Sequence, residues 1–288
     1  MKKFILSVLL IPAVFSAQQT VSRDPEIANY VSQVSADSLK SHINKLVSFG
    51  TRHTMSSTTD AKKGIGAARN WVLSKFKNYA KNSDGRMEVF LQSQTIQPDG
   101  KRINQPTDLG NAIAILRGTD PNDKRIFMIG GHLDSRVSDV MNAKDFAPGA
   151  NDDGSGVGAV IESARILSQS KFPATIVFVA FSGEEQGLLG AKMLAEKAKT
   201  ENWQLEALLN NDMIGNNLTS ETNLINANQL RVFSEGLPQF DLDKKAQGIR
   251  NLGLENDGEA RQLARYIKEI GERYVDNLEV KLIYRNDR

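Results

Sequence analysis

The sequence predicts an α/β fold, in which a sheet of mostly buried strands is covered by helices on both faces. Short, continuous apolar runs bounded by turn residues are typical of strands that are buried on both sides. The chain has such runs at Asn111–Leu116, Ile126–Ile129 and Thr175–Phe181. Segments with apolar residues at helical spacing lie between and after them, at Val157–Leu167 and Leu188–Lys197. Strands that alternate with helices in this way form layered α/β sheets.

The N-terminal region is predicted to be helical before its first strand. Residues 24–50 form an amphipathic stretch in two parts, with Asp37 in the position of an N-cap for the second part. We interpret residues 18–48 as an N-terminal helical segment or a propeptide. A further helix covers 60–81, and the alternating segment Met87–Ile96 is a strand.

The C-terminal region continues the alternation. Leu205–Asn210 has the pattern of a strand, Asn256–Leu278 that of a long helix, and Leu278–Tyr284 that of a last strand. No internal repeat or low-complexity linker divides the chain. Residues 49–288 are therefore predicted to form one domain.

The composition agrees with one large globular domain. Of the 288 residues, 40% are hydrophobic and 24% charged, which excludes a disordered chain, a collagen-like repeat and a coiled coil. The formal net charge is only +2, so the basic excess of a nucleic-acid-binding protein is missing and we expect no such partner. The lack of cysteine excludes disulfides, a thiol nucleophile and cysteine-bound zinc. Histidine is scarce, with only His42, His53 and His132.

The first 17 residues have the pattern of a secretory signal peptide. Two lysines precede an apolar run from Phe4 to Phe15, and small residues follow up to Ala17. The run is too short to cross the ~30 Å hydrocarbon core of a bilayer, and an apolar N-terminal strand is the alternative. We therefore expect residues 1–17 to be removed during export. The protein would then be secreted or periplasmic, with no membrane contact after cleavage.

Imidazole and carboxylate side chains stand at the ends of the predicted strands and at the start of one helix. They are His132, Asp134, Asp152, Asp153, Glu184, Glu185 and Asp212. In open α/β sheets, ligands bind at the carboxyl ends of the strands, so we expect these side chains to meet at one edge. Unpaired acids there would repel one another. One histidine with several carboxylates suits Zn²⁺, or Mn²⁺ or Co²⁺, so the sequence predicts a metal site.

The spacing of these residues suggests separate roles. His132 and Asp134 alternate along a strand, so that Asp134 can accept the second ring N–H of His132 and fix its tautomer. Of the adjacent Glu184 and Glu185, one can bind metal while the other stays free as a general base. Each pair alone is a weak signal, because such pairs are common on protein surfaces. Their joint occurrence in order favours the metal site.

The acid pair Asp152-Asp153 lies in the glycine-rich segment Pro148–Gly156, directly before a helix. One of the two carboxylates could bridge two metals, because the flanking glycines let the backbone approach closely. A plain turn and a phosphate-binding loop are the alternatives, although two aspartates would repel a phosphate. His53, in the segment FGTRHT, lies outside the strand ends and is predicted to be structural or at the rim of the site. His42 is predicted to be solvated on its helix.

The segments HLDS, APGANDDGSG, FSGEEQGLLGA and NNDMIG resemble, in order and spacing, the secreted di-zinc aminopeptidases of the bacterial leucyl aminopeptidase type. The segments FGTRHT and NAIAILRG are also similar to the N-terminal half of that family. The resemblance runs from Phe49 to Arg288 and implies a mixed, largely parallel, eight-stranded sheet between helices, as in zinc exopeptidases. It also implies peptide substrates, from which the N-terminal residue is hydrolysed by a metal-activated water.

The resemblance assigns metal ligands. His132 and Asp212 would bind one zinc ion and Glu185 the other. Asp152 would bridge both ions through a cis peptide bond to Asp153. Two zinc ions are therefore expected in the complete enzyme.

The resemblance also assigns catalytic roles. Glu184 would take a proton from the attacking water and return it to the leaving amine, and Asp134 would orient His132. A glutaminyl-cyclase-like acyltransferase with a single zinc shares this fold and is an alternative, although the double aspartate favours the two-metal peptidase. A related carboxypeptidase and a metal-poor, peptidase-like binding module are further alternatives.

The sequence departs from the family pattern at one ligand. The family completes its second zinc site with a histidine beyond the strand that begins near Lys281, and no histidine follows His132 here. We therefore expect the peptidase domain to be incomplete at its C-terminus. The second zinc site, left with Asp152 and Glu185, should be weak, because catalytic zinc ions usually have three protein ligands. An open sheet edge is also expected.

Overall fold

The computed structural model describes residues 22–218, 225–235, 244, 247–248 and 258–285. Its helices are α1 Pro25–Ser32, α2 Ala36–Val47, α3 Gly64–Ala80, α4 Gly154–Leu167, α5 Leu189–Thr200 and α7 Glu259–Tyr274. Its strands are β1 Met87–Ile96, β2 Thr107–Leu116, β3 Arg125–His132, β4 Thr175–Phe181, β5 Gln204–Asn210, β6 Gln229–Glu235 and β7 Glu279–Arg285. The predicted signal peptide, 1–17, lies outside the described residues. Within the described ranges, every helix is too short or too polar to cross a membrane.

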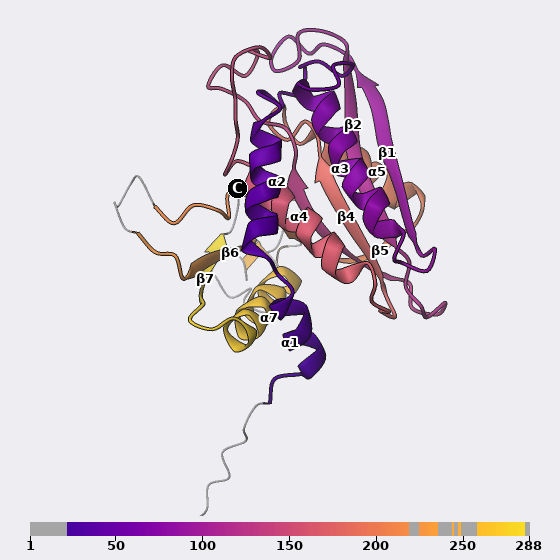
Figure 1. Cartoon of the computed structure of the whole chain (residues 1–288), viewed down its shortest axis with the longest axis vertical. Coiled ribbons are helices and arrows are strands. Elements are labelled where there is room, and N and C mark those ends of the chain that lie inside the picture. Colours follow the sequence, from indigo (N-terminus) through magenta and orange to yellow (C-terminus); the bar gives the residue numbers. More distant parts are fainter. Residues whose placement is uncertain (1–21, 219–224, 236–243, 245–246, 249–257, 286–288) are drawn as a thin grey trace, which may run out of the picture.

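A five-stranded sheet in the order β1-β2-β4-β3-β5 forms the centre of the molecule (Figure 1). The pairs β1-β2 and β2-β4 are antiparallel, whereas β3 runs parallel to both β4 and β5. The predicted mixed α/β sheet is thus confirmed. The implied eight-stranded sheet is not seen in the described part of the chain, where β6 and β7 form a separate parallel pair. Because β3, β4 and β5 are parallel, their carboxyl ends meet at one edge.

Helices cover both faces of the sheet at its centre. Phe178 of β4 packs in the larger core with Phe76 of α3 and Ile161 of α4, and Figure 1 shows these helices along the near face. The neighbouring Val177 points to the opposite face and packs in a second core with Leu194 of α5. Successive residues of a strand face opposite sides. Burial on both sides therefore explains why the central strands are continuous apolar runs.

The edge strand β5 is far less covered than the central strands. Its side chains Leu205, Leu208 and Leu209 are 45%, 41% and 40% exposed, and β3 is the one described strand with which β5 pairs. Figure 1 shows β6, β7 and α7 apart from this sheet, close to α1. The strand predicted at Leu205–Asn210 is confirmed.

Two local features differ from the sequence prediction. The helix α2 is capped by Ser35, whose Oγ accepts the N–H of Ser38 at 3.2 Å, while Asp37 lies in the first turn. Ser35 has the extended backbone of an N-cap residue, so the helix begins earlier than expected. The strand β6 was not predicted, although Leu230 and Val232 alternate with polar neighbours in its sequence. The long helix predicted at Asn256–Leu278 corresponds to α7, Glu259–Tyr274, and its first two predicted residues lie outside the described part.

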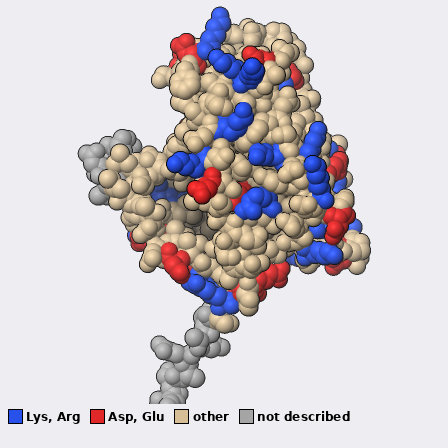
Figure 2. Space-filling model, in the orientation of Figure 1, with Lys and Arg blue, Asp and Glu red and all other residues tan. Residues whose placement is uncertain are grey.

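The surface mixes charges of both signs. On the face shown in Figure 2, basic and acidic side chains are interspersed over the helices and the sheet. Several of them form ion pairs, such as Arg117 with Glu88 at 3.2 Å and Arg125 with Asp123 at 2.7 Å. Exposed pairs of this kind contribute little to stability, in general 0 to about 1 kcal/mol each. The fold therefore depends on its two cores and its buried polar contacts.

His42 is buried, so the prediction of a solvated side chain was wrong. The helix α2 packs against α4, which encloses the imidazole next to the ring of Trp71, with centroids 5.9 Å apart. Nε2 lies 3.9 Å from a carboxylate oxygen of Glu162, and neither ring nitrogen has a hydrogen-bond partner among the described residues. Burial lowers the pKa of His42; Lys75 and Arg165 lower it further, and Glu162 opposes them.

Mild acid should destabilise the protein through His42. Because the pKa of this imidazole is lower in the folded than in the unfolded chain, protonation favours unfolding. The stability that its neutral form contributes is lost as the pH falls through the unfolded value of about 6.5. Between pH 7 and pH 5, the unfolding free energy measured with urea should fall more steeply for the wild type than for His42→Gln. Parallel pH dependences of the two proteins would contradict this assignment.

Candidate metal centre

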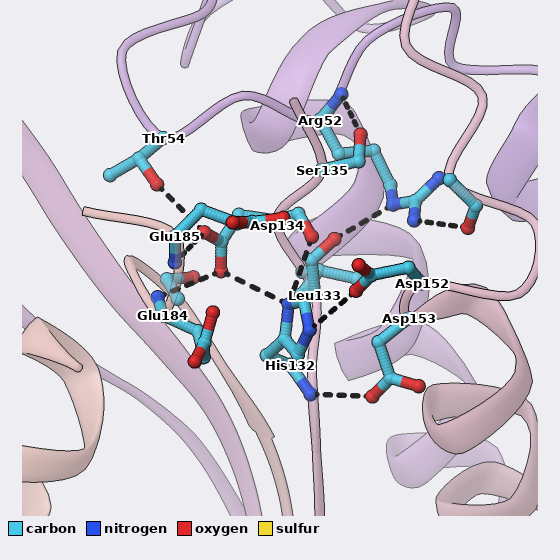
Figure 3. A network of polar contacts seen from close by, with 12 residues as sticks. Arg52, Thr54, His132, Leu133, Asp134, Ser135, Asp152, Asp153, Glu184 and Glu185 are labelled. Carbon is cyan, nitrogen blue, oxygen red and sulfur yellow. Dashed lines mark hydrogen bonds and ion pairs between the residues drawn. The ribbon is translucent and has the colours of Figure 1, made fainter. Parts of the chain in front are cut away.

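Three parallel strands and one helix bring the predicted residues to the same edge of the sheet (Figure 3). His132 is the last residue of β3, Glu184 follows β4, Asp212 follows β5, and Asp152 lies just before α4. The backbone is tightly packed where α4 begins. A Cβ atom on Gly156 would lie 2.2 Å from a carbonyl oxygen of the segment after β5, so only glycine fits there. The close packing holds the four segments against one another.

His132, Asp152 and Asp212 form a group that can hold a metal ion. His132 Nε2 lies 2.9 Å from Asp152 Oδ1 and 4.0 Å from Asp212 Oδ1. The donor atoms of all three residues lie within 4.8 Å of one another. The imidazole is buried, whereas both carboxylates are partly open to solvent. The structure thus brings together three of the four residues that were predicted to bind metal.

The adjacent Asp152 and Asp153 point their carboxylates to different partners. The peptide bond between them is cis, as the family resemblance implies. Asp152 faces His132, whereas the buried carboxylate of Asp153 accepts the backbone N–H groups of His132 and Gly156, both at 2.9 Å. Asp153 is also the N-cap of α4. One aspartate therefore belongs to the metal group and the other holds β3 to the start of α4.

Asp134 contacts His132 differently from the sequence prediction. The partner of His132 Nδ1 is the backbone carbonyl oxygen of Asp134, at 3.1 Å, while the carboxylate lies 3.9 Å away. The fully buried carboxylate accepts the backbone N–H of Glu184 at 3.1 Å and of Glu185 at 3.0 Å, and the hydroxyl of Thr54 at 3.2 Å. Asp134 thus fixes the turn that carries the glutamates (Figure 3). Its carbonyl leaves Nε2 of His132 as the nitrogen available to a metal.

The two glutamates have separate surroundings. Gly183, with a φ of 73°, lies in the left-handed region that favours glycine and lets the chain turn sharply after β4. The Glu185 carboxylate accepts from Arg136 Nε at 2.6 Å, and its carbonyl accepts from Arg102 at 2.7 Å. Within the described ranges, no protein group donates to the half-buried Glu184 carboxylate. Glu185 is therefore paired with an arginine and stands outside the three-residue metal group.

Negative charge is in excess at this edge. Burial raises the pKa of Glu184, and the neighbouring acids raise it further. Burial also raises the pKa of Asp153, to about 7. Burial alone would lower the pKa of His132, but its hydrogen bond to Asp152 and the nearby carboxylates raise it to about 10. The same hydrogen bond lowers the pKa of Asp152. A site that draws a proton onto an imidazole in this way also attracts a metal cation.

Arg52 is the residue of this site that the sequence analysis missed. It is 1% exposed. Its Nε donates to the carbonyl oxygen of Leu133 at 2.7 Å, and its Nη groups donate to those of Pro148 at 2.7 Å and Gly149 at 2.9 Å (Figure 3). Burial lowers its pKa to about 10, and three nearby aspartates oppose that shift. Arg52 therefore joins the end of β3 to the loop before Asp152. The sequence signal was its place in FGTRHT.

His53 lies beside this site and outside the metal group, in agreement with the structural role predicted for it. Its ring is completely buried. Nε2 lies 3.0 Å from the carbonyl oxygen of Val140 and 3.2 Å from the side-chain amide of Gln186. It therefore supports the loops around the metal group.

Replacing Arg52 by methionine should loosen both the fold and the metal group. The carbonyl groups of Leu133, Pro148 and Gly149, and that of Leu46 at 3.2 Å, lose their donor in Arg52→Met, which should lower the unfolding free energy by about 3 kcal/mol or more. Zinc affinity should also fall, because the loop before Asp152 loses its attachment to β3. Arg69→Met is the matched control, since Arg69 is also buried but contacts Asp108 in β2. Urea denaturation and zinc titration would measure both effects; unchanged zinc affinity in Arg52→Met would contradict the assignment.

By sequence, the chain is similar to fungal zinc metalloproteases. Residues 111–239 match Peptidase family M28. A probable zinc metalloprotease of Leptosphaeria maculans is 41% identical over 92% of this chain and 61% of its own length. One of Pyricularia oryzae is 40% identical over 92% of this chain and 52% of its own length. The chain thus spans between half and two thirds of these relatives. They are fungal, so they do not bear out the bacterial type named by the resemblance.

Solved structures show the same fold at low sequence identity. The Legionella pneumophila LapA aminopeptidase has a TM-score of 0.59 and 20% identity, and the match covers 89% of this chain and 57% of LapA. A Zn-dependent exopeptidase from Parabacteroides distasonis has a TM-score of 0.57 and 20% identity, over 88% and 78% of the two chains. A Bacteroides thetaiotaomicron glutaminyl cyclase has a TM-score of 0.58 and 17% identity, over 87% and 77%. The fold is that of zinc exopeptidases, and the sequence of 111–239 relates the chain to Peptidase family M28.

Proposed function

We propose that this chain carries the catalytic site of a metal-dependent exopeptidase, which hydrolyses peptides with a metal-activated water. The observation that carries the proposal is the group of His132, Asp152 and Asp212, beside Glu184, whose carboxylate has no protein donor among the described residues. A buried imidazole and two carboxylates at a strand edge are one nitrogen and two oxygen ligands that a divalent cation can bind together. The match to Peptidase family M28 supports the same chemistry.

The three side chains fit zinc. One nitrogen and two oxygen donors are ligands that zinc accepts, and a catalytic zinc has three protein ligands with one position open. The carboxylates that raise the pKa of His132 to about 10 would also favour a cation bound at its Nε2. When bound, zinc would act as a Lewis acid that lowers the pKa of water and polarises a peptide carbonyl. Mn²⁺ and Co²⁺ accept similar donors.

Glu184 is the general base of this proposal. Its backbone N–H donates to Asp134 Oδ1 at 3.1 Å, which fixes the position of its Cα atom. Its carboxylate is half-buried, and the raised pKa brings it closer to neutral pH, where a base both accepts and releases a proton effectively. It would take a proton from the attacking water in the first step and deliver that proton to the leaving amine in the last. Among the described residues, its carboxylate has no protein partner to compete with water.

Release of the N-terminal residue is the finer form of the proposal. It is supported by the motifs HLDS and APGANDDGSG and by the fold shared with the LapA aminopeptidase. Glutaminyl cyclases share the fold too, so fold alone does not separate hydrolysis from cyclisation. The adjacent Asp152 and Asp153 favour the peptidase. Export through the signal peptide at 1–17 is part of the same proposal, as is a bacterial relationship.

The second zinc ion is also a proposal. Asp152 and Glu185 would hold it, and Glu185 is now paired with Arg136 at 2.6 Å. An ion at that position must compete with the guanidinium and has fewer protein ligands than the first ion. We therefore place the first ion at His132, Asp152 and Asp212, and expect the second to bind more weakly.

Glu184→Gln should abolish most of the activity while the protein still binds zinc. Loss of a general base costs about 10²- to 10⁴-fold in kcat, and Glu184 is outside the three-residue metal group. The assay is the release of free amino acid from aminoacyl-anilides and short peptides, with pyroglutamate from Gln-peptides measured in parallel. Glu196→Gln, an exposed glutamate of α5, serves as control. Pyroglutamate without free amino acid would show a cyclase instead, and unchanged kcat in Glu184→Gln would remove the assigned base.

Zinc titration should resolve one tight and one weak ion. The first depends on Asp212 and the second on Glu185, so Asp212→Asn should abolish the tight site and Glu185→Gln only the weak one. Removal of zinc by a chelator should abolish hydrolysis, and one added equivalent should restore part of it. Calorimetry with the purified protein measures both affinities. Two ions of equal, tight affinity would contradict the assignment of ligands.

A further inference from the structure

Three buried polar residues next to the metal group have no part in the proposed chemistry. His53 and Thr54 come from the segment FGTRHT, and Gln186 follows the two glutamates. Their exposed fractions are 0%, 1% and 3%. Burial of polar groups is unfavourable unless each is hydrogen-bonded, so their partners must be consistent with one set of protons.

The proton on His53 can be placed from its neighbours. The backbone N–H of Met55 donates to Nδ1 at 3.1 Å, so Nδ1 is an acceptor. A neutral imidazole then carries its proton on Nε2. Nε2 lies 3.0 Å from the carbonyl oxygen of Val140 and 3.2 Å from the amide of Gln186. His53 therefore donates from Nε2 to Val140, and the amide atom that faces it must also be an acceptor.

This assignment orients the amide of Gln186. With its nitrogen toward His53, two N–H groups would face each other, and Thr54 would have to share one proton between Gln186 and Asp134. With the oxygen toward His53 and the nitrogen toward Thr54, no two donors face each other: the Nε2 proton of His53 lies between the oxygens of Val140 and Gln186, and the Thr54 proton goes to Asp134 alone. The two orientations of an amide differ only in this hydrogen-bond pattern. The oxygen of Gln186 therefore faces His53.

We infer that His53, Gln186 and Thr54 form a one-way hydrogen-bond chain that ends on the Asp134 carboxylate and positions Glu184 and Glu185. With the amide oriented in this way, the Nε2–H of His53 is shared between the oxygens of Val140 and Gln186. The amide nitrogen of Gln186 then donates to Thr54, and Thr54 donates to Asp134 Oδ2 at 3.2 Å. The same carboxylate receives the N–H groups of both glutamates.

The hydrogen-bond chain gives His53 and Thr54, in the segment FGTRHT, a role that is separate from that of Arg52 in the same segment. The hydrogen bond from Thr54 restricts rotation of the Asp134 carboxylate. The turn that carries Glu184 and Glu185 is therefore bound to a fixed acceptor. His53 and Thr54 act through Asp134 and are positioning residues, without contact to the reacting atoms. The effect on hydrolysis rests on the proposed exopeptidase function, whereas the effect on the backbone of the turn does not.

Variants of Thr54 and Gln186 test this hydrogen-bond chain. Thr54→Val removes the hydroxyl, and Thr54→Ser restores it. Gln186→Glu keeps the shape of the side chain but replaces the N–H donor that faces Thr54 by a carboxylate oxygen. This oxygen competes with Asp134 for the hydroxyl proton of Thr54. Thr107→Val is the matched control, because Thr107 is buried and its hydroxyl donates to the Gln105 carbonyl oxygen, with no other partner within the described ranges.

The first readout is hydrogen exchange at the amides of Glu184 and Glu185 in the full-length protein. Exchange should rise about tenfold in Thr54→Val and in Gln186→Glu, the effect of weakening one hydrogen bond. Thr54→Ser and Thr107→Val should stay at the wild-type rate. Exchange that is equal in all variants would overturn the inference, whether or not the protein is a peptidase.

The second readout is steady-state hydrolysis of an aminoacyl-anilide by the zinc-loaded protein. In Thr54→Val and Gln186→Glu, kcat should fall about 10- to 100-fold, the usual effect of residues that orient a catalytic group, with KM nearly unchanged. Thr54→Ser should recover kcat. A wild-type protein without activity would refute the proposed function. The hydrogen-exchange result would then decide by itself whether the hydrogen-bond chain exists. Equal loss of kcat in Thr107→Val would show a general structural effect and overturn the inference.

Discussion

The crowding of carboxylates at one buried edge of the sheet is the constraint on which the rest of this site depends. Like charges in a partly buried position repel strongly, so each acid must find a compensating group. Asp134 and Asp153 are compensated by backbone N–H groups, and Arg52 places a buried positive charge close to both. Asp152 and Asp212 keep solvent-accessible oxygens around His132. The protein therefore neutralises one set of acids itself and leaves the other set to a cation.

The fold and the metal group could be predicted because they follow from local patterns. Continuous apolar runs gave the central strands, since β2 and β4 are covered on both faces. Chemistry-bearing residues directly after such runs must share an edge when the strands are parallel. This is why His132, Asp152 and Asp212 could be expected at one edge, and the family resemblance then singled them out as ligands. The edge strand β5 was found by the same pattern, although its leucines are largely exposed.

The features that sequence analysis missed depend on contacts between distant segments. Apart from its place in the segment FGTRHT, nothing local distinguishes Arg52 from a surface arginine, because its carbonyl partners lie just after β3 and on the loop before α4. His42 has the spacing of an exposed helix position, and only the packing of α2 on α4 encloses it. The partner of the Asp134 carboxylate could not be predicted either. It is set by the turn after β4, whose course depends on Gly183 rather than on charge.

The order of the metal ligands along the chain has a thermodynamic consequence. His132, Asp152 and Asp212 are far apart in sequence and meet only when β3 has paired with β4 and β5. An unfolded chain cannot present the three together, so an ion held by them binds the native state alone. Such an ion stabilises the fold by mass action, by about 4 kcal/mol at a thousandfold excess over Kd. Folding and the binding of such an ion would then be coupled, so that adding the metal would raise the midpoint of unfolding.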